Sequence, residues 1–106
     1  MRDLMGMMGK MQELQGRMEK MQAELETTEV TGTAGGGLVS VTLSAKGTLK
    51  KISLDQSLLQ PAEKEIVEDL ISAAHADARA KAERAMEEKM RELTGGLPLP
   101  PGLKLF

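Results

Sequence analysis

Residues 35–54, GGGLVSVTLSAKGTLKKISL, hold the densest strand pattern of the chain. After three glycines, the apolar residues Val39, Val41 and Leu43 alternate with serine and threonine, which is the period of a half-buried strand. Residues 45–48, AKGT, supply a turn before a second run of apolar and polar residues. The stretch therefore predicts a β-hairpin that directs one face to a core.

The sheet is expected to have three antiparallel strands in meander order. Residues 27–33, TTEVTGT, are rich in β-branched residues and predict a strand before those over 38–45 and 48–54. Leu49 is out of phase with Ile52, which indicates either a β-bulge or an apolar residue on the second face. A sheet this small needs a helix on one face.

The N-terminal segment, residues 3–26, has a heptad pattern typical of a helix with a packed seam. Its a and d positions are Leu4, Met7, Met11, Leu14, Met18, Met21 and Leu25. Three glycines weaken this helix by about 1 kcal/mol each relative to alanine. We therefore expect it to depend on tertiary or intersubunit packing, and we interpret the methionines as a core seam rather than a soft ligand groove.

A second helix is predicted over residues 62–93. Asp55 suits the N-cap of a short turn over 56–59, and Pro61 suits the first position of the helix that follows. No glycine or proline interrupts the run before Gly95. At 1.5 Å per residue the helix is about 46 Å long, whereas a compact 100-residue domain has a radius of gyration near 13 Å. This helix must therefore protrude or pack on another chain.

Large apolar residues are concentrated in the first half of this helix, which we expect to be buried. They are Ile66, Val67, Leu70 and Ile71. The second half is rich in alanine and in charges of alternating sign, and is expected to be solvated. Residues 97–106 carry three prolines and predict an extended or loosely docked tail, which leaves residues 1–96 as a single domain.

The composition allows only a modest core. The 106 residues include one phenylalanine and no tyrosine or tryptophan, so burial depends on aliphatic residues and nine methionines. An intersubunit core would compensate for this.

The absence of cysteine excludes disulfides and thiolate metal sites. The first residues form no uninterrupted apolar run, so we expect neither an export signal nor a membrane span, and a cytoplasmic location.

Catalytic chemistry has little support in the sequence. The single histidine, His75, has no cysteine or second histidine to work with, and we interpret it as a helix-surface or packing residue. The glycines at 35–37 precede a strand rather than a helix and lack a following GKS or GKT, so we interpret them as a loop and not a phosphate cradle. We expect no enzyme activity, no cofactor and no metal.

This composition is compatible with binding to duplex DNA if the contacts are made with the phosphate backbone. The net charge, 14 minus 16, is −2 and gives no global basic footprint. Phosphate contacts need no aromatic residues, whereas single-strand binding needs stacking platforms. The candidate contacts are Lys10, Arg17 and Lys20 on the first helix, Arg79, Lys81 and Arg84 on the second, and secondarily Lys46, Lys50 and Lys51 on the hairpin. Taken singly, each is an ordinary solubility or helix-pairing charge.

Several dispersed motifs also occur in one order along the chain. They are Gly37-Leu38-Val39 with Val41-Thr42, Asp55 followed by Ser57-Leu58-Leu59, Glu68-Asp69-Leu70 with Ala73-Ala74, and Pro100-Pro101-Gly102. With them, nearly the whole chain resembles the YbaB/EbfC family of bacterial nucleoid-associated proteins. The resemblance implies an α+β subunit of order α-β-β-β-α in an intertwined homodimer. Its helices would hold duplex DNA like tweezers, in the cytoplasm and nucleoid, without enzymatic activity.

We therefore expect a homodimer that binds duplex DNA through phosphates, largely without sequence preference, and organises the nucleoid or modulates transcription. The dimer and core seam is assigned to Leu4, Met11, Leu14, Met18, Met21, Val39, Val41, Leu43, Ile52 and Leu70. The alternative is an interaction or assembly factor in replication or repair with no direct DNA role, motivated by the negative charge and the methionine seam. Partners that survive nuclease treatment would favour this alternative.

Overall fold

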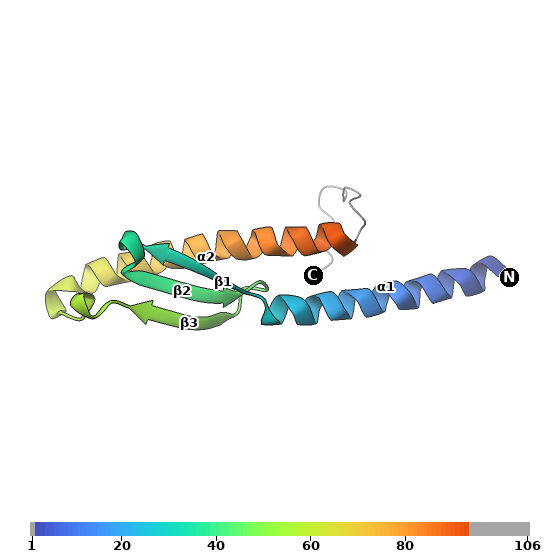
Figure 1. The fold of residues 1–106 in the computed structure, drawn as a ribbon, viewed down its shortest axis with the longest axis horizontal. Helices are drawn as coiled ribbons and strands as arrows, with labels where there is room; N and C mark the ends of the chain where they lie inside the picture. Colours follow the sequence, from blue (N-terminus) through green and yellow to red (C-terminus); the bar gives the residue numbers. More distant parts are fainter. Residues whose placement is uncertain (1, 94–106) are drawn as a thin grey trace.

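The subunit is an elongated α+β structure made of one small sheet and two long helices (Figure 1). The computed structural model describes residues 2–93. The elements are α1 (Arg2–Thr27), β1 (Glu29–Ala34), β2 (Val39–Ser44), β3 (Leu49–Leu54) and α2 (Lys64–Leu93), with single 3₁₀ turns at Gly35–Gly37, Gln56–Leu58 and Pro61–Glu63. The predicted α-β-β-β-α order and fold class are confirmed. The predicted tail over residues 97–106 lies outside the described residues.

The three strands form an antiparallel sheet in the order β1-β2-β3. Thr42 pairs with Lys51 and Leu43 pairs with Leu49, which leaves Lys50 as an extra residue in β3. The bulge places Leu49 on the same face as Leu43, because cross-strand partners share a face. Of the two interpretations of Leu49, the bulge is therefore correct.

The first strand begins later than expected, at Glu29 rather than at residue 27. The hydroxyl of Thr27 donates to the carbonyl of Glu24 at 3.1 Å, and the hydroxyl of Thr28 donates to the same carbonyl at 2.7 Å. The same Glu24 carbonyl also accepts the Thr28 N–H at 2.8 Å, so helical hydrogen bonding continues up to Thr28. The β-branched threonines therefore complete the helix instead of starting the strand.

Helix α2 lies across one face of the sheet, over β1 and β2 (Figure 1). The alternating residues Val39, Val41 and Leu43 are fully buried there against Ala74 and Ala78. The small alanine side chains let the helix backbone approach the sheet closely, so apolar area is buried without large side chains. The core is thin and consists of two clusters, one between α2 and the sheet and a second where the end of α2 meets the base of α1.

The expected burial of the first half of α2 is wrong at its first turn. Val67, Leu70 and Ile71 pack against the core, but Ile66 is 50% exposed. The first turn of α2 extends past the end of the strands (Figure 1), and the adjacent residues Ile66 and Val67 point about 100° apart around the helix, so only Val67 meets the core. The burial predicted from apolar character alone is therefore wrong for Ile66.

The two edges of the sheet differ. At the β1 edge, the Thr33 N–H donates to Asp77 Oδ2 at 3.0 Å, and Lys81 Nζ donates to the Thr31 carbonyl at 2.8 Å. Side chains of α2 thus satisfy an edge that would otherwise invite strand pairing. Over β3 the sheet carries no helix in the described part of the chain, and Ile52 is 44% exposed.

Helix α1 leaves the sheet and protrudes (Figure 1). The subunit measures 72 × 24 × 16 Å and its radius of gyration is 19.3 Å, well above the value of about 13 Å for a compact domain of this size. Only the C-terminal end of α1 is packed: Met21 and Leu25 contact Ala45 and the last turns of α2. The second half of α2, which we expected to be solvated, is therefore the support for the base of α1.

Candidate nucleic-acid interface

A groove runs between the C-terminal half of α1 and the end of α2. It is lined by Arg17, Lys20, Met21 and Glu24 from α1 and by Lys89, Glu92 and Leu93 from α2. Three cations and two carboxylates therefore share one groove with the apolar residues Met21 and Leu93. Lys89 is paired with both carboxylates, Glu24 at 3.2 Å and Glu92 at 3.7 Å, so Arg17 and Lys20 are the cations not paired within the groove that an anionic ligand could meet.

The predicted cations fall into separate groups on the molecule. Arg17 and Lys20 lie together in the groove, and Lys10 lies further out on the exposed surface of α1. Arg79, Lys81 and Arg84 lie on α2 but do not line the groove. The structure thus separates the α1 candidates from the α2 candidates.

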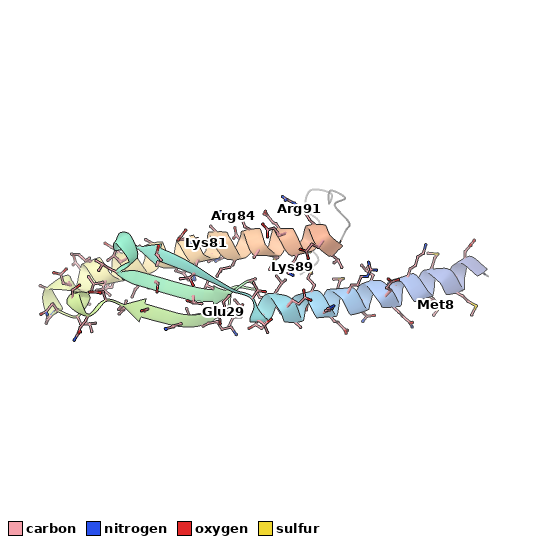
Figure 2. All side chains as sticks on the ribbon, viewed as in Figure 1. Met8, Glu29, Lys81, Arg84, Lys89 and Arg91 are labelled. Atoms are coloured by element: carbon pink, nitrogen blue, oxygen red, sulfur yellow. The ribbon has the colours of Figure 1, made fainter. Side chains whose placement is uncertain are left out.

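Lys89 is the groove residue that sequence reasoning missed. Its ammonium group donates to Glu24 Oε2 of α1 at 3.2 Å, and Figure 2 shows the side chain between the two helices. In the sequence it is only a charge near a helix C-terminus, where a lysine is favoured for local reasons. No local signal shows that residue 89 meets a helix 65 positions away.

The exposed ion pairs of the candidate arginines leave those arginines accessible. Arg17 pairs with Glu13 at 2.6 Å, and Arg79 pairs with Glu83 at 3.9 Å. All four side chains are more than half exposed, and such pairs contribute little stability. A phosphate can therefore replace the carboxylate at low cost.

Two of the candidate lysines are engaged in holding the fold. Lys81 bonds the Thr31 carbonyl and lies 3.2 Å from Asp77, so contact with DNA would reopen the β1 edge. Lys50 donates to Glu26 at 3.1 Å. Lys46 and Lys51 are exposed, and Lys51 shares the sheet face opposite α2 with its cross-strand partner.

The remaining site types receive no support from residues 2–93. His75 is exposed on α2. Within that range no group of three or more histidine, aspartate or glutamate side chains is placed to hold a metal ion. No helix in the described residues is both long and apolar enough to cross a membrane.

Acid pH is expected to destabilise the fold through carboxylates whose pKa is lowered by folding, which are Glu26, Asp55 and Asp77. The pKa of Glu26 is lowered first by the hydrogen bond from Lys50, and the pKa of Asp77 is lowered first by the Thr33 N–H. A lowered pKa in the folded state adds stability that is complete above the unfolded value and is lost as the pH falls through the folded value. Stability should therefore decline below the ordinary values of 4.5 and 3.8.

Urea unfolding followed by circular dichroism over a pH series tests this expectation. The variant Asp77→Asn removes one titrating group and should decline less steeply at acid pH than the wild type. A midpoint that is unchanged from neutral to strongly acid pH would contradict the assignment.

These features define a class: a small α+β subunit with a protruding helix and a charged groove at the base of that helix. The sequence profile of the YbaB/EbfC DNA-binding family matches residues 1–97, and the chain belongs to this family. The chain is 59% identical over 105 residues, 99% of its length and 98% of the relative's, to nucleoid-associated protein R00231 of Rhizobium meliloti. A nucleoid-associated protein of Methylocella silvestris is 56% identical over the same shares.

The fold has a counterpart of known structure. The crystal structure of Helicobacter pylori HP0035 matches with a TM-score of 0.65 and 26% identity, covering 84% of this chain and 89% of that one. The family is a DNA-binding family and not a family of enzymes. The resemblance drawn from the sequence motifs is thereby confirmed.

Proposed function

We propose that the protein is a homodimer that binds duplex DNA through phosphate contacts, largely without sequence preference, and so organises the nucleoid or modulates transcription. The observation that carries this proposal is the protruding α1, which exposes the cations Lys10, Arg17 and Lys20, the last two of which line the groove. Nucleoid localisation follows from the same proposal.

The side chains support DNA binding through phosphate contacts. Residues 2–93 contain no phenylalanine, tyrosine or tryptophan, so the large rings on which bases stack are absent from this part of the chain. The exposed donors are lysine and arginine, which bind phosphate oxygens without reading sequence. A dimer would carry twice −2, or −4, so binding should be local and should weaken steeply with salt.

Two uncovered apolar surfaces support the homodimer. On α1, Leu4, Met11 and Leu14 are 62%, 67% and 49% exposed, and on the uncovered face of β3 Ile52 is 44% exposed. Within one subunit these two surfaces cannot cover each other, because α1 extends away from the sheet (Figure 1). In a dimer, the apolar surfaces of a second copy would cover both of these apolar surfaces.

Neutralising the α1 cations is expected to weaken DNA binding. The variant Lys10→Gln/Arg17→Gln/Lys20→Gln should bind a short fluorescent duplex at least tenfold more weakly at low salt. The slope of log affinity against log salt should become shallower by about 0.9 for each phosphate that the variant no longer neutralises. Fluorescence anisotropy across a salt series measures both quantities.

The matched comparison sets Arg79→Gln/Arg84→Gln, which removes two cations of α2 outside the groove, against the α1 variant Arg17→Gln/Lys20→Gln, which removes two cations inside it. A smaller reduction in affinity than in the α1 variant is expected. An equal or larger reduction would move the contact surface to α2. Absence of wild-type binding even at low salt would overturn the proposed function.

The second candidate function is that of an interaction or assembly factor in replication or repair without a DNA role. The observation in its favour is the exposed apolar surface of α1, where Met5 and Met8 are 78% and 56% exposed outside the heptad seam. A pulldown from nuclease-treated extract separates the two functions. Partners retained equally by the wild type and by the α1 cation variant would favour the assembly factor.

A further inference from the structure

The C-terminal end of α1 contradicts the local rule for helix ends. Glu24 and Glu26 lie near this end, and the last turn has no basic residue. The helix macrodipole disfavours negative charge at a C-terminus, where lysine or arginine is preferred. A residue that breaks a local preference indicates a tertiary role.

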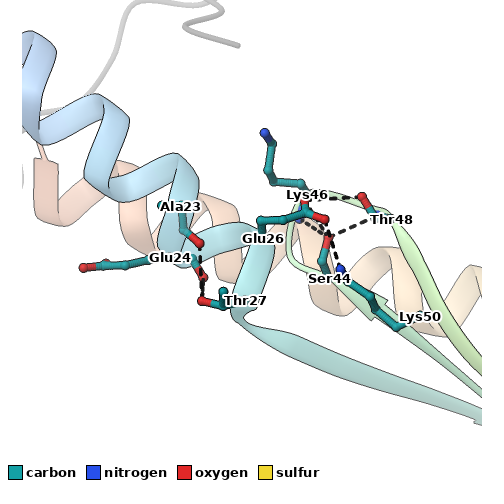
Figure 3. A network of polar contacts seen from close by, with 8 residues as sticks. All are labelled: Ala23, Glu24, Glu26, Thr27, Ser44, Lys46, Thr48 and Lys50. Carbon is teal, nitrogen blue, oxygen red and sulfur yellow. Dashed lines mark hydrogen bonds and ion pairs between the residues drawn. The ribbon is translucent and has the colours of Figure 1, made fainter.

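Glu26 binds the β2–β3 turn with both carboxylate oxygens (Figure 3). Lys50 Nζ donates to Oε1 at 3.1 Å, while the hydroxyls of Thr48 and Ser44 donate to Oε2 at 3.3 and 3.5 Å. Ser44 is fully buried, and its Oγ also accepts the Thr48 N–H at 3.1 Å. The carboxylate thus reaches a turn that is itself internally bonded.

The backbone reinforces the same junction. The Ala45 N–H is shared between the carbonyls of Leu25 at 3.0 Å and Thr28 at 2.8 Å, which lie at the end of α1 and just beyond it. On the other side of α1, Glu24 accepts from Lys89 of α2 at 3.2 Å. The base of α1 is therefore held between the hairpin and α2.

The angle at this base controls where the far end of α1 lies. A helix of 26 residues at 1.5 Å per residue is about 39 Å long. A rotation of about 10° at the base then moves the far end by about 7 Å, more than twice a hydrogen-bond length. Cations on α1 can meet successive phosphates only if this angle is held.

We propose that Glu26 is a positioning residue that fixes the direction of α1 by joining its C-terminal end to Lys50 and to the β2–β3 turn. The consequence for DNA binding rests on the proposed function, whereas the consequence for helix direction does not. Simple electrostatics predicts that removal of a carboxylate improves DNA binding. Positioning predicts that removal of this carboxylate weakens it.

The direction of α1 can be measured without DNA. The chain has no cysteine, so cysteines introduced at the exposed positions Gln12 of α1 and Ser72 of α2 accept spin labels at two defined sites. Labelled protein is diluted into excess unlabelled protein, and pulsed electron paramagnetic resonance gives the distance distribution within one subunit. Glu26→Gln and Lys50→Gln should each broaden or shift it.

The matched control is Glu19→Gln, which removes the same charge from an exposed position of α1 that has no ion pair among residues 2–93. Its distance distribution should equal that of the wild type. The exchange Glu26→Lys/Lys50→Glu restores the pair with reversed charges and should return the distribution to the wild-type width. Wild-type distributions in both Glu26→Gln and Lys50→Gln would overturn the proposal.

Anisotropy with a fluorescent duplex supplies the second readout. Glu26→Gln is expected to bind at least about fivefold more weakly than the wild type, and Glu19→Gln equally or more tightly. A gain in affinity for Glu26→Gln equal to that for Glu19→Gln would overturn the positioning role in binding. A wild type that binds no DNA would overturn the proposed function alone, because the distances still decide the direction of α1.

Discussion

Gly32→Ala is expected to lower the free energy of unfolding by about 3 kcal/mol or more, because α2 rests on the sheet at this glycine. A Cβ added to Gly32 would lie 2.8 Å from Ala78 Cα and closer still to Ala78 N and the Ala74 carbonyl oxygen. All three are backbone atoms of a helix, which cannot swing aside like the end of a long side chain. The helix must move off the core to admit one methyl group.

Gly9→Ala is the matched control for this prediction. A Cβ at Gly9, on the exposed part of α1, meets no atom within 4 Å. Alanine in a helix interior is better than glycine by about 0.5–1 kcal/mol, so this variant should be slightly more stable than the wild type. Urea unfolding at equal subunit concentrations compares the variants, since dimerisation would make stability depend on concentration. A Gly32→Ala variant within about 0.5 kcal/mol of wild type would contradict the close packing of α2.

Met11→Glu/Leu14→Glu is expected to abolish the proposed homodimer. Both side chains are exposed in the subunit, so the changes leave the subunit core intact. Each subunit contributes both residues, so four side chains lose a burial worth about 1.5–3 kcal/mol each when complete, and dimerisation weakens by at least roughly a thousandfold before the burial of charge is counted. Sedimentation should show the 11.4 kDa subunit in place of twice that mass. DNA binding should fall as well, because one arm alone reaches only one side of the duplex.

Met5→Glu/Gln12→Glu serves as the control for the dimer. Both positions are exposed on α1 but lie outside the a and d seam, so the same added charge should leave the mass of a dimer. A wild type with the mass of a single subunit would contradict the homodimer. Dissociation by both variants alike would show that charge, and not the seam, governs association.

Much of the fold was predictable from short-range patterns. The two-residue period over Val39, Val41 and Leu43 predicted the buried face of β2, and these three residues are fully buried. The heptads of α1 predicted an apolar seam, but only its end at Met21 and Leu25 is buried in the subunit. Periodicity identifies an apolar face, whereas the element that covers this face depends on where the chain places its other elements.

The errors have a common physical cause. Ile66 was expected to be buried by its apolar character, yet it is 50% exposed while its neighbour Val67 packs against the core. Thr27 was assigned to a strand by its β-propensity, yet its hydroxyl completes a helix. In both places an intrinsic preference was weaker than the tertiary setting, as is expected for propensities that differ by less than about 1 kcal/mol.

The sequence by itself determined the kinds and order of the elements, the buried face of the hairpin and the family, because periodicity and motif order are local properties of the chain. Only the tertiary structure decided which charges are free. Lys50, Lys81 and Lys89 look alike in the sequence, but each has a hydrogen-bond partner that is distant along the chain, 24, 50 and 65 residues away respectively. Such contacts depend on the path of the whole chain, so no local pattern distinguishes these lysines from Lys10 and Lys20, for which the structure shows no ion pair in residues 2–93.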